Sequence, residues 1–259
     1  VADKVTAKNL GEISCALRTN IQRDAQNGYV KISIAPYIRD MLERFGEYLK
    51  DKSPRTTPGN VDDQITDADL PDTEEEKEAL SKLPFRELLG CLWWPTWMCR
   101  PDILYYVHDC SRHVSKPSRK LWTKLIAICR YLKGTMDFGV VMRRPRRLDL
   151  FELDTLEAWV DGDWAGCKNT RKSRTGALVY FYGMLVSWMS EMQTAVALSS
   201  AESEYYGIIK VGKTVLWMRN LTMQRTGLSF RSGHSDSLRQ HCCHRTDERE
   251  LFWQSSPPL

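Results

Sequence analysis

The chain has 259 residues, a length that allows one large or two small domains. Its 42% hydrophobic and 27% charged residues are typical of a soluble globular protein. The most apolar stretch, residues 177–188, is far shorter than the roughly 20 residues of a membrane-spanning helix, so we expect no membrane partner. Because the chain starts with Val1 and no charged-then-apolar leader follows, we expect a fragment without a signal peptide.

The net charge of +4 is unevenly distributed along the chain. Residues 62–78 contain nine acidic side chains and one basic one, whereas residues 85–150 contain thirteen Lys or Arg and five acids. A basic middle suits a polyanionic partner, although a solvated basic face explains it equally well. The eight cysteines form no C-x-x-C pair, so we expect reduced, mostly buried thiols in an intracellular protein.

The first third of the chain combines a strand, a helix and a polar segment. Residues 29–34 alternate apolar and polar side chains, which predicts a strand. Pro36 then opens a helix, and Gly46 is expected to end it. Residues 52–84 are polar and acidic and have no period, so we expect a surface loop.

A helical block and a basic turn follow. Apolar side chains at helical spacing predict one helix that contains residues 103–114 and a second over residues 121–132. Residues 138–142 predict a strand. Four arginines then surround Pro145, and this turn is the expected joint between two domains.

After this turn the pattern changes to strands. The predicted strands cover residues 156–161, 177–182 and 184–188. Gly183 marks a tight turn between the last two, and a long helix is expected over residues 199–225. Ser199 and Glu202 have the spacing of a capping box at the start of this helix. The order of elements indicates an α/β (α+β) fold in which a mixed sheet carries packed helices.

The last segment, residues 229–259, has neither a helical nor a strand period. A disordered tail and a shifted reading frame both explain this composition. If the underlying DNA encodes a more regular segment in another frame, the second explanation holds.

Two strand-end acids and one helical acid are the candidates for chemistry. Asp161 and Asp163 end a predicted strand, and Glu204 lies in the first turns of the long helix, on a face with Ile208 and Val211. A carboxylate on that apolar face is costly to bury unless a metal ion or a basic partner compensates it. An acid that merely complements the helix dipole is the simpler alternative. Oxygen ligands of this kind suit Mg²⁺ or Mn²⁺.

Two other candidates are weaker. Residues 241–244, His-Cys-Cys-His, offer four zinc-competent side chains, but their spacing departs from that of zinc sites. Trp93, Trp94 and Trp97 have the chemistry to stack nucleobases. Because they lie among leucines, we expect them in the core instead.

Several motifs in the same order resemble one known family. Four of them resemble the ribonuclease H domain of copia-type retrotransposon polyproteins: VDGDWAG (160–166), RKSRTGALV (171–179), SWMSEMQTAVALSSAESEYYG (187–207) and LWMRNL (216–221). Residues 9–46 and FRELLGCLW…CRPDILYYVHDCSR…YLKGT (85–135) resemble the end of the same family's reverse transcriptase. The resemblance covers nearly all of residues 9–228, and the shared order makes it highly specific.

The resemblance implies roles for individual acids. Asp161 and Glu204 match the family's catalytic, metal-binding acids, and a third acid is expected on the next strand. Asp236 stands near that place, although its surroundings do not look like a strand. Asp163 and Ser199 would support the site without binding metal. We expect the Asp161 and Glu204 carboxylates to share Mg²⁺ or Mn²⁺, which requires a separation of roughly 4–5 Å.

The resemblance also implies an RNA–DNA hybrid as partner, recognised through the ribose 2′-hydroxyl groups of the strand that is cut. The candidate nucleic-acid-binding residues are Arg143, Arg144, Arg146, Arg147, Arg171 and Lys172. Other parts of the parent polyprotein are the second expected class of partner. We expect an intracellular location, in a cytoplasmic particle or the nucleus.

The predicted organisation has three parts. Residues 1–148 would be a helical remnant of the reverse transcriptase thumb or connection region, and residues 149–228 an incomplete ribonuclease H-like domain. Residues 229–259 would be a divergent, disordered tail. The family's fourth acid, its following histidine segment and the polymerase Tyr-x-Asp-Asp motif are not visible, so we expect a truncated or frameshifted copy that does not polymerise DNA.

These expectations lead to one main hypothesis and two alternatives. The main hypothesis is metal-dependent hydrolysis of RNA in RNA–DNA hybrids, impaired in this copy. The first alternative is a catalytically dead remnant that binds nucleic acid, and the second is a product without function.

Overall fold

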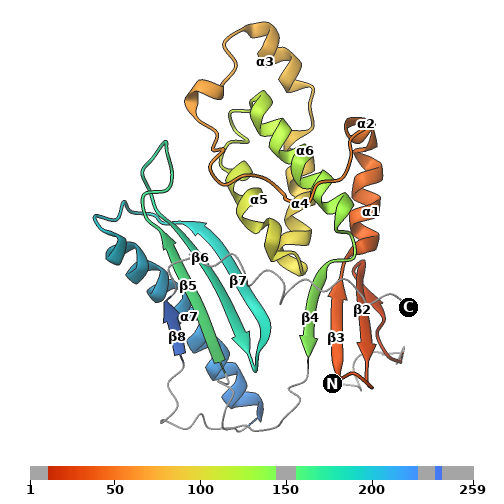
Figure 1. Cartoon of the computed structure of the whole chain (residues 1–259), viewed down its shortest axis with the longest axis vertical. Coiled ribbons are helices and arrows are strands. Elements are labelled where there is room, and N and C mark those ends of the chain that lie inside the picture. The colour runs from red at the N-terminus through yellow and green to blue at the C-terminus, as the bar shows by residue number, and fades with distance from the viewer. Residues whose placement is uncertain (1–10, 144–155, 227–236, 241–259) are drawn as a thin grey trace, which may run out of the picture.

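Two sheets divide the chain into an N-terminal and a C-terminal region (Figure 1). The computed structural model describes residues 11–143, 156–226 and 237–240. We refer to residues 11–143 as the N-terminal region and to the other two ranges as the C-terminal region. The mixture of helices and sheets confirms the predicted fold class.

An antiparallel sheet forms the base of the N-terminal region. Its strands, in spatial order, are β1 (Cys15–Ala16), β2 (Thr19–Asp24), β3 (Tyr29–Ser33) and β4 (Gly139–Arg143). In the turn between β2 and β3, the Asp24 carboxylate accepts a hydrogen bond from the Asn27 amide at 2.8 Å. The predicted strands near residues 29–34 and 138–142 are confirmed, and both belong to this sheet. Strand β4 returns from far along the chain to complete a sheet.

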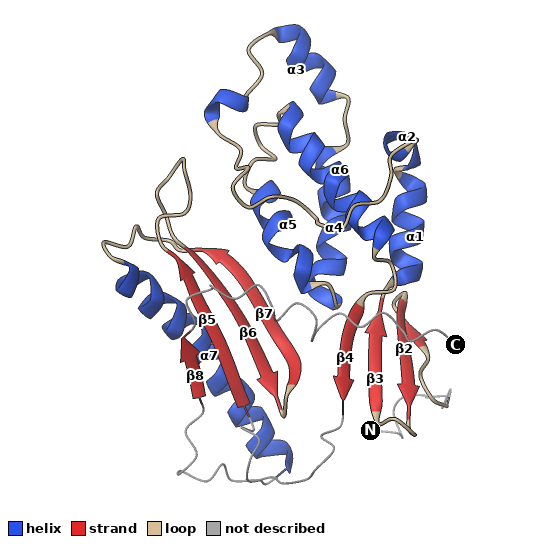
Figure 2. Ribbon diagram, in the orientation of Figure 1, coloured by secondary structure: helices blue, strands red, loops and turns tan. Residues whose placement is uncertain are grey.

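Helices cover one end of this sheet (Figure 2). They are α1 (Ala35–Arg44), α2 (Gly46–Leu49), α3 (Glu74–Ser81), α4 (Phe85–Met98), α5 (Leu104–Ser111) and α6 (Arg119–Gly134), with 3₁₀ turns η2 (Asp67–Asp69) and η3 (Pro101–Ile103). The predicted helices are confirmed, and their apolar stripes meet in one core that includes Ile38, Leu92 and Leu125. Gly46 does not end the helical path, because it is the first residue of α2.

The predicted surface loop over residues 52–84 is wrong in part, because it contains η2 and α3. The Thr73 hydroxyl caps α3 by accepting a hydrogen bond from the Glu76 amide at 3.2 Å. Three glutamates in the first turn complement the helix dipole. Only Leu80 of this helix is buried, so the apolar period that would have predicted it is missing.

Helix α4 contains a proline that removes one backbone hydrogen bond, and a side chain of another helix replaces the missing donor. Pro95 has no N–H group and leaves the carbonyl of Cys91 without its helical donor. The Tyr37 hydroxyl of α1 donates a hydrogen bond to that carbonyl at 2.9 Å. The contact therefore joins α1 to α4 at the position where α4 is weakest.

A fully buried arginine follows α4. Arg100 is 0% exposed and forms an ion pair with Asp102 at 2.8 Å. It also donates hydrogen bonds to the carbonyl and hydroxyl of Thr135 at 2.8 and 2.7 Å. The Tyr131 hydroxyl donates to Asp102 at 2.7 Å. These partners compensate the burial of the charge and connect η3 to α6.

The sheet of the C-terminal region is mixed, as expected. Its strands are β5 (Leu156–Asp163), β6 (Arg174–Phe181), β7 (Met184–Met192) and β8 (Ser237–Gln240), in the order β7-β6-β5-β8. The first three run antiparallel, and β8 is parallel to β5. Tyr182 and Gly183 form the predicted turn with φ of 48° and 73°. Helix α7 (Ser200–Thr226) packs on one face of this sheet.

The structure corrects the prediction for the last segment. Strand β8 lies inside residues 229–259, where no strand was expected. None of the helices in the described ranges is long and apolar enough to cross a bilayer. The six cysteines described there carry free thiols, and four of them are buried, as expected.

Candidate active site

Two acids lie at the end of the central strand β5. Asp161 pairs with Gly176 of β6, and Asp163 pairs with Arg174. The other set of alternating side chains, including Val160, is buried against α7. Asp161 and Asp163 therefore share the opposite face of the sheet, which is turned toward the N-terminal region.

The two carboxylates are close enough to influence each other. Partial burial raises the pKa of Asp163, and the negative charge of Asp161 raises it further, while the Arg174 guanidinium acts in the opposite direction. Repulsion between two carboxylates is relieved by a cation. This pair of oxygen donors thus fits one side of a Mg²⁺ or Mn²⁺ site.

The start of α7 is fixed by the predicted cap. The Ser199 hydroxyl accepts a hydrogen bond from the Glu202 amide at 3.2 Å, and the Glu202 carboxylate accepts one from the Leu198 amide at 2.6 Å. The Trp164 indole donates to the Ala197 carbonyl at 3.0 Å. These bonds hold the N-terminus of α7 beside the turn that follows β5.

Strand β5 and helix α7 touch through their backbones at the candidate site. A Cβ atom at Gly162 would lie 2.7 Å from the hydroxyl oxygen of Ser203 and 3.1 Å from its carbonyl carbon, so only glycine allows this approach. Asp161 precedes Gly162, and Glu204 follows Ser203. Each acid is therefore next in sequence to a residue of the Gly162–Ser203 contact, Asp161 on β5 and Glu204 on α7.

The face of α7 that packs on the sheet is centred on Ser203, Gly207 and Val211, and the half-buried Glu204 lies beside it. Asp161 occupies the face of the sheet away from α7. Glu204 would consequently reach Asp161 past the end of β5 rather than across the sheet. A metal shared by the two carboxylates stays a prediction.

A glutamine that the sequence did not single out connects three elements at this point. The Gln193 side-chain amide donates hydrogen bonds to Thr175 of β6 at 3.0 Å and to the carbonyl of Ser203 at 2.8 Å. Its own backbone amide donates to the Ser173 carbonyl at 2.8 Å. Gln193 thus fixes the first turn of α7, which carries Glu204, against the sheet.

The remaining predicted residues are distributed differently. Asp236 lies outside the described residues, but β8 begins at the next position and pairs with β5. Arg143 is exposed at the end of β4, and Arg171 and Lys172 lie in the loop between β5 and β6. Arg144, Arg146, Arg147 and residues 241–244 also lie outside the described residues. Within the described ranges, no three acids, histidines or cysteines gather into a metal-binding group.

The tryptophan trio is only partly in the core. Trp93 and Trp94 are half-buried, whereas Trp97 is 60% exposed and stacks on Trp93 with ring centres 5.9 Å apart. The expectation of core positions is therefore wrong for Trp97.

Near the acidic pair, Arg174 of β6 contacts two residues of the N-terminal region. The Arg174 side chain lies 3.7 Å from Asp109 and 2.9 Å from His108, both in α5. Because a guanidinium can only donate, His108 Nδ1 accepts, and the ring is neutral in this contact. Burial, followed by the positive charge of Arg174, lowers the pKa of His108. No signal in the sequence relates these residues, because they are far apart along the chain.

Comparison with known proteins identifies the family. The chain is 32% identical over 221 residues, 85% of its length, to the retrovirus-related Pol polyprotein from transposon TNT 1-94 of Nicotiana tabacum. It is 29% identical over 188 residues to the Pol polyprotein from transposon RE2 of Arabidopsis thaliana. The chain belongs to the copia-type retrotransposon Pol polyproteins.

The copia-type chain matches only a part of these polyproteins. It spans 16% of the TNT 1-94 polyprotein and 12% of the RE2 polyprotein. It is also 27% identical over 212 residues to the uncharacterized mitochondrial protein AtMg00810 of Arabidopsis thaliana, and covers 80% of that protein. No protein-family model and no solved structure matches the chain.

Proposed function

We propose that the C-terminal region is a ribonuclease H-type unit that hydrolyses RNA in RNA–DNA hybrids and is impaired in this copy. The observation that supports the proposal is the close approach of Gly162 to Ser203, the residues next in sequence to Asp161 and Glu204. Strand β8 does not support Asp236 as the third acid, because its parallel register places Ser237 opposite Glu157, at the other end of β5 from Asp161 and Asp163.

Each acid has a separate task in this proposal. Asp161 and Glu204 would hold a divalent ion from two elements, and Asp163 would tune the charge next to it. A bound Mg²⁺ or Mn²⁺ would activate a water molecule and stabilise the leaving oxygen of the phosphodiester. The described residues contain too few ligands for a second ion, so we expect slow cleavage or none.

The basic residues would bind the hybrid. Arg171 and Lys172 lie in the loop that follows the acidic pair, and Arg143 is exposed at the end of β4. Contacts with phosphates release counterions, so hybrid affinity should fall steeply as salt increases. Affinity that does not change with salt would contradict this assignment.

The test uses the purified chain and a version that carries the family's ordinary C-terminal segment after Asp236. We expect the extended chain to cut the RNA strand in Mg²⁺. Asp161→Asn or Glu204→Gln should lower its rate about 10²- to 10³-fold, because each removes a stabiliser of the transition-state charge.

Glu202→Gln is the matched control. It removes the same charge two residues from Glu204, but at the helix cap, and should change the rate little. If Glu202→Gln and Glu204→Gln reduce cleavage equally, the assignment of Glu204 is wrong. Hybrid binding without cleavage by the extended chain would favour a catalytically dead nucleic-acid-binding remnant.

A further inference from the structure

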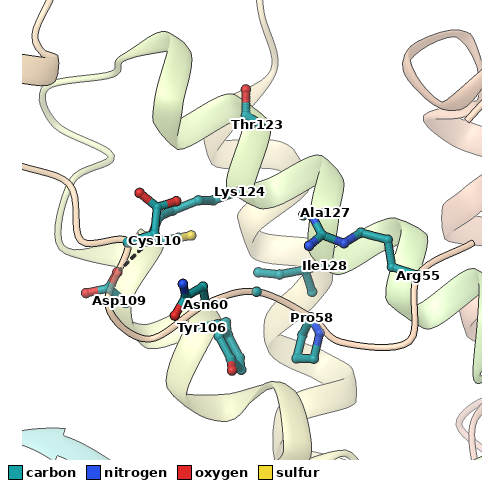
Figure 3. A pocket seen from close by; sticks show the side chains of 12 residues that line it. Arg55, Pro58, Asn60, Tyr106, Asp109, Cys110, Thr123, Lys124, Ala127 and Ile128 are labelled. Atoms are coloured by element: carbon teal, nitrogen blue, oxygen red, sulfur yellow. Dashed lines mark ion pairs between the residues drawn. The ribbon is translucent and has the colours of Figure 1, made fainter.

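A segment of the N-terminal region, which we call the strap, crosses α5 and α6 and ends beside the candidate active site. The strap comprises residues 53–69. At its start, the Arg55 amide donates to the Arg130 carbonyl at 3.1 Å. Figure 3 shows a pocket beneath it, with Arg55, Pro58 and Asn60 of the strap facing Ile128 of α6. The middle of the strap packs on α5, where Gly59 lies against the Tyr106 ring.

The far end of the strap is firmly attached to the N-terminal region. Ile65 is 2% exposed and belongs to the main core. The Lys120 ammonium of α6 donates to the Gln64 carbonyl at 2.8 Å and contacts the carboxylates of Asp63 and Asp69 at 3.0 and 3.2 Å. The residues before and after Gln64 are thus anchored in the N-terminal region, which fixes the position from which the Gln64 side chain extends.

The Gln64 side chain binds the loop between β5 and β6 from both of its polar atoms. Its Nε2 donates to the Gly166 carbonyl at 2.7 Å, and its Oε1 accepts from the Lys168 amide at 2.9 Å. The Asn169 side chain returns a hydrogen bond to the Ile65 carbonyl at 3.1 Å. Because these hydrogen bonds go to backbone groups of the loop, as they do between paired strands, they restrict the conformations of the loop backbone.

The loop that Gln64 holds begins after Asp163, the last residue of β5, and contains residues with unfavourable backbone angles. Ala165 and Arg171 have φ of 51° and 55°, a left-handed conformation that is unfavourable for residues other than glycine. The Ala165 amide donates to the Ser173 hydroxyl at 3.0 Å. In addition, the guanidinium of Arg112, which follows α5 directly, contacts the Cys167 sulfur at 3.0 Å.

We infer that Gln64 is a positioning residue that holds the turn after Asp163 and thereby sets the geometry of the acidic pair. The candidate site would then be assembled from both regions rather than from the C-terminal region alone. The catalytic consequence rests on the proposed ribonuclease function, whereas the structural hold does not.

The test compares amide hydrogen exchange in the full chain and in Gln64→Ala. Removing both hydrogen bonds should speed exchange in residues 163–170 about 5- to 30-fold, with little change in β2 and β3. Gln64→Glu should act in the same way, because a carboxylate cannot donate to the Gly166 carbonyl. Gln26→Ala, in the exposed turn between β2 and β3, is the matched control and should leave residues 163–170 unchanged.

Mn²⁺ binding, followed by electron paramagnetic resonance, is the second measurement. Weaker binding by Gln64→Ala than by Gln26→Ala, together with faster local exchange, supports the positioning role. Unchanged exchange in residues 163–170 overturns it, and so does faster exchange with unchanged Mn²⁺ affinity. If the unaltered chain binds no Mn²⁺, the ribonuclease proposal fails, and local exchange alone decides whether Gln64 holds the turn.

Discussion

The two regions are stabilised by different means. The N-terminal region has a large core in which stripes from several helices meet, and it also buries the satisfied charge of Arg100. The C-terminal region has a small core between α7 and three strands, and the outer face of α7 leaves large apolar side chains exposed. These side chains include Tyr205, Ile209, Leu216 and Trp217.

The difference shows that the C-terminal region is supported from outside. The Trp188 indole of β7 donates to the Thr96 carbonyl of α4 at 2.8 Å. Arg174 reaches α5, and Gln64 of the strap reaches the loop after β5. The well-packed region therefore holds the surface of the less packed one that carries the candidate site.

The largest effect should come from the buried charge of the N-terminal region. Arg100→Met leaves Asp102 buried without its cation, which costs about 3–5 kcal/mol of unfolding free energy when such a pair is broken. Denaturant unfolding would measure this loss. Arg44→Ala, which removes an exposed pair with Glu87, should cost less than about 1 kcal/mol. If both variants lose the same unfolding free energy, the buried Arg100 network stabilises the protein no more than an exposed ion pair does.

A smaller effect is expected at the contact between β5 and α7. Gly162→Ala forces a methyl group against the backbone of Ser203 and should destabilise the C-terminal region by about 1–3 kcal/mol. Gly176→Ala, at the position of β6 that pairs with Asp161 and lies next to open space, is the control and should have little effect. Exchange rates in α7 distinguish the two variants. Similar rates would contradict the tight approach.

The joint between the regions should depend on pH through His108. The pKa of this side chain is lowered below its usual value of 6.5, so the unfolded chain takes up a proton first. Stability is therefore complete above about pH 6.5 and falls as the pH drops toward the lowered pKa. Arg174, Glu191, Arg112 and Asp109 are the charged groups that act on the ring.

His108→Gln keeps an acceptor for Arg174 and should flatten the change in the unfolding midpoint between pH 8 and pH 5. His113→Gln is a comparison, because burial also lowers the pKa of His113, and Arg112 and Lys124 are the cations that act on its ring. If only His113→Gln removes the pH dependence of the unfolding midpoint, the contact between His108 and Arg174 does not cause that dependence.

The smallest effect is expected on the exposed face of α7. Trp217 is 63% exposed, so Trp217→Gln should change the unfolding free energy by no more than about 0.5 kcal/mol. Val211→Ala on the packed face should cost about 1–3 kcal/mol. A large loss in Trp217→Gln would indicate that this face is covered, and the comparison of the two regions would need revision.

Local patterns were sufficient to predict most of the helices and strands. The stripe of α6 and the Gly183 turn depend only on neighbouring residues. Strand β2, with the sequence TNIQRD, lacks apolar alternation and is held by its partners, so it was missed. Helix α3 was missed for a similar reason, although the Thr73 cap and the glutamates of its first turn were visible.

The candidate site was predictable only where its residues mark ends of elements. Asp161 and Glu204 were identified because a strand ends at one and a helix begins near the other. Gln193 and Gln64 carry no such signal, since an amide side chain gains its role from partners brought close by folding. The same holds for Arg174, whose partners belong to the other region.

The parallel pairing of β8 with β5 has a consequence for synthesis on the ribosome. Glu157 is opposite Ser237, and Val160 is opposite Gln240, so the partners are separated by some 80 positions, 237 minus 157. During translation, β5 can pair with β6 at once, but its other edge has to wait for β8. An open edge is a template for foreign strands. A nascent chain is thus most prone to aggregate between the emergence of β7 and that of β8.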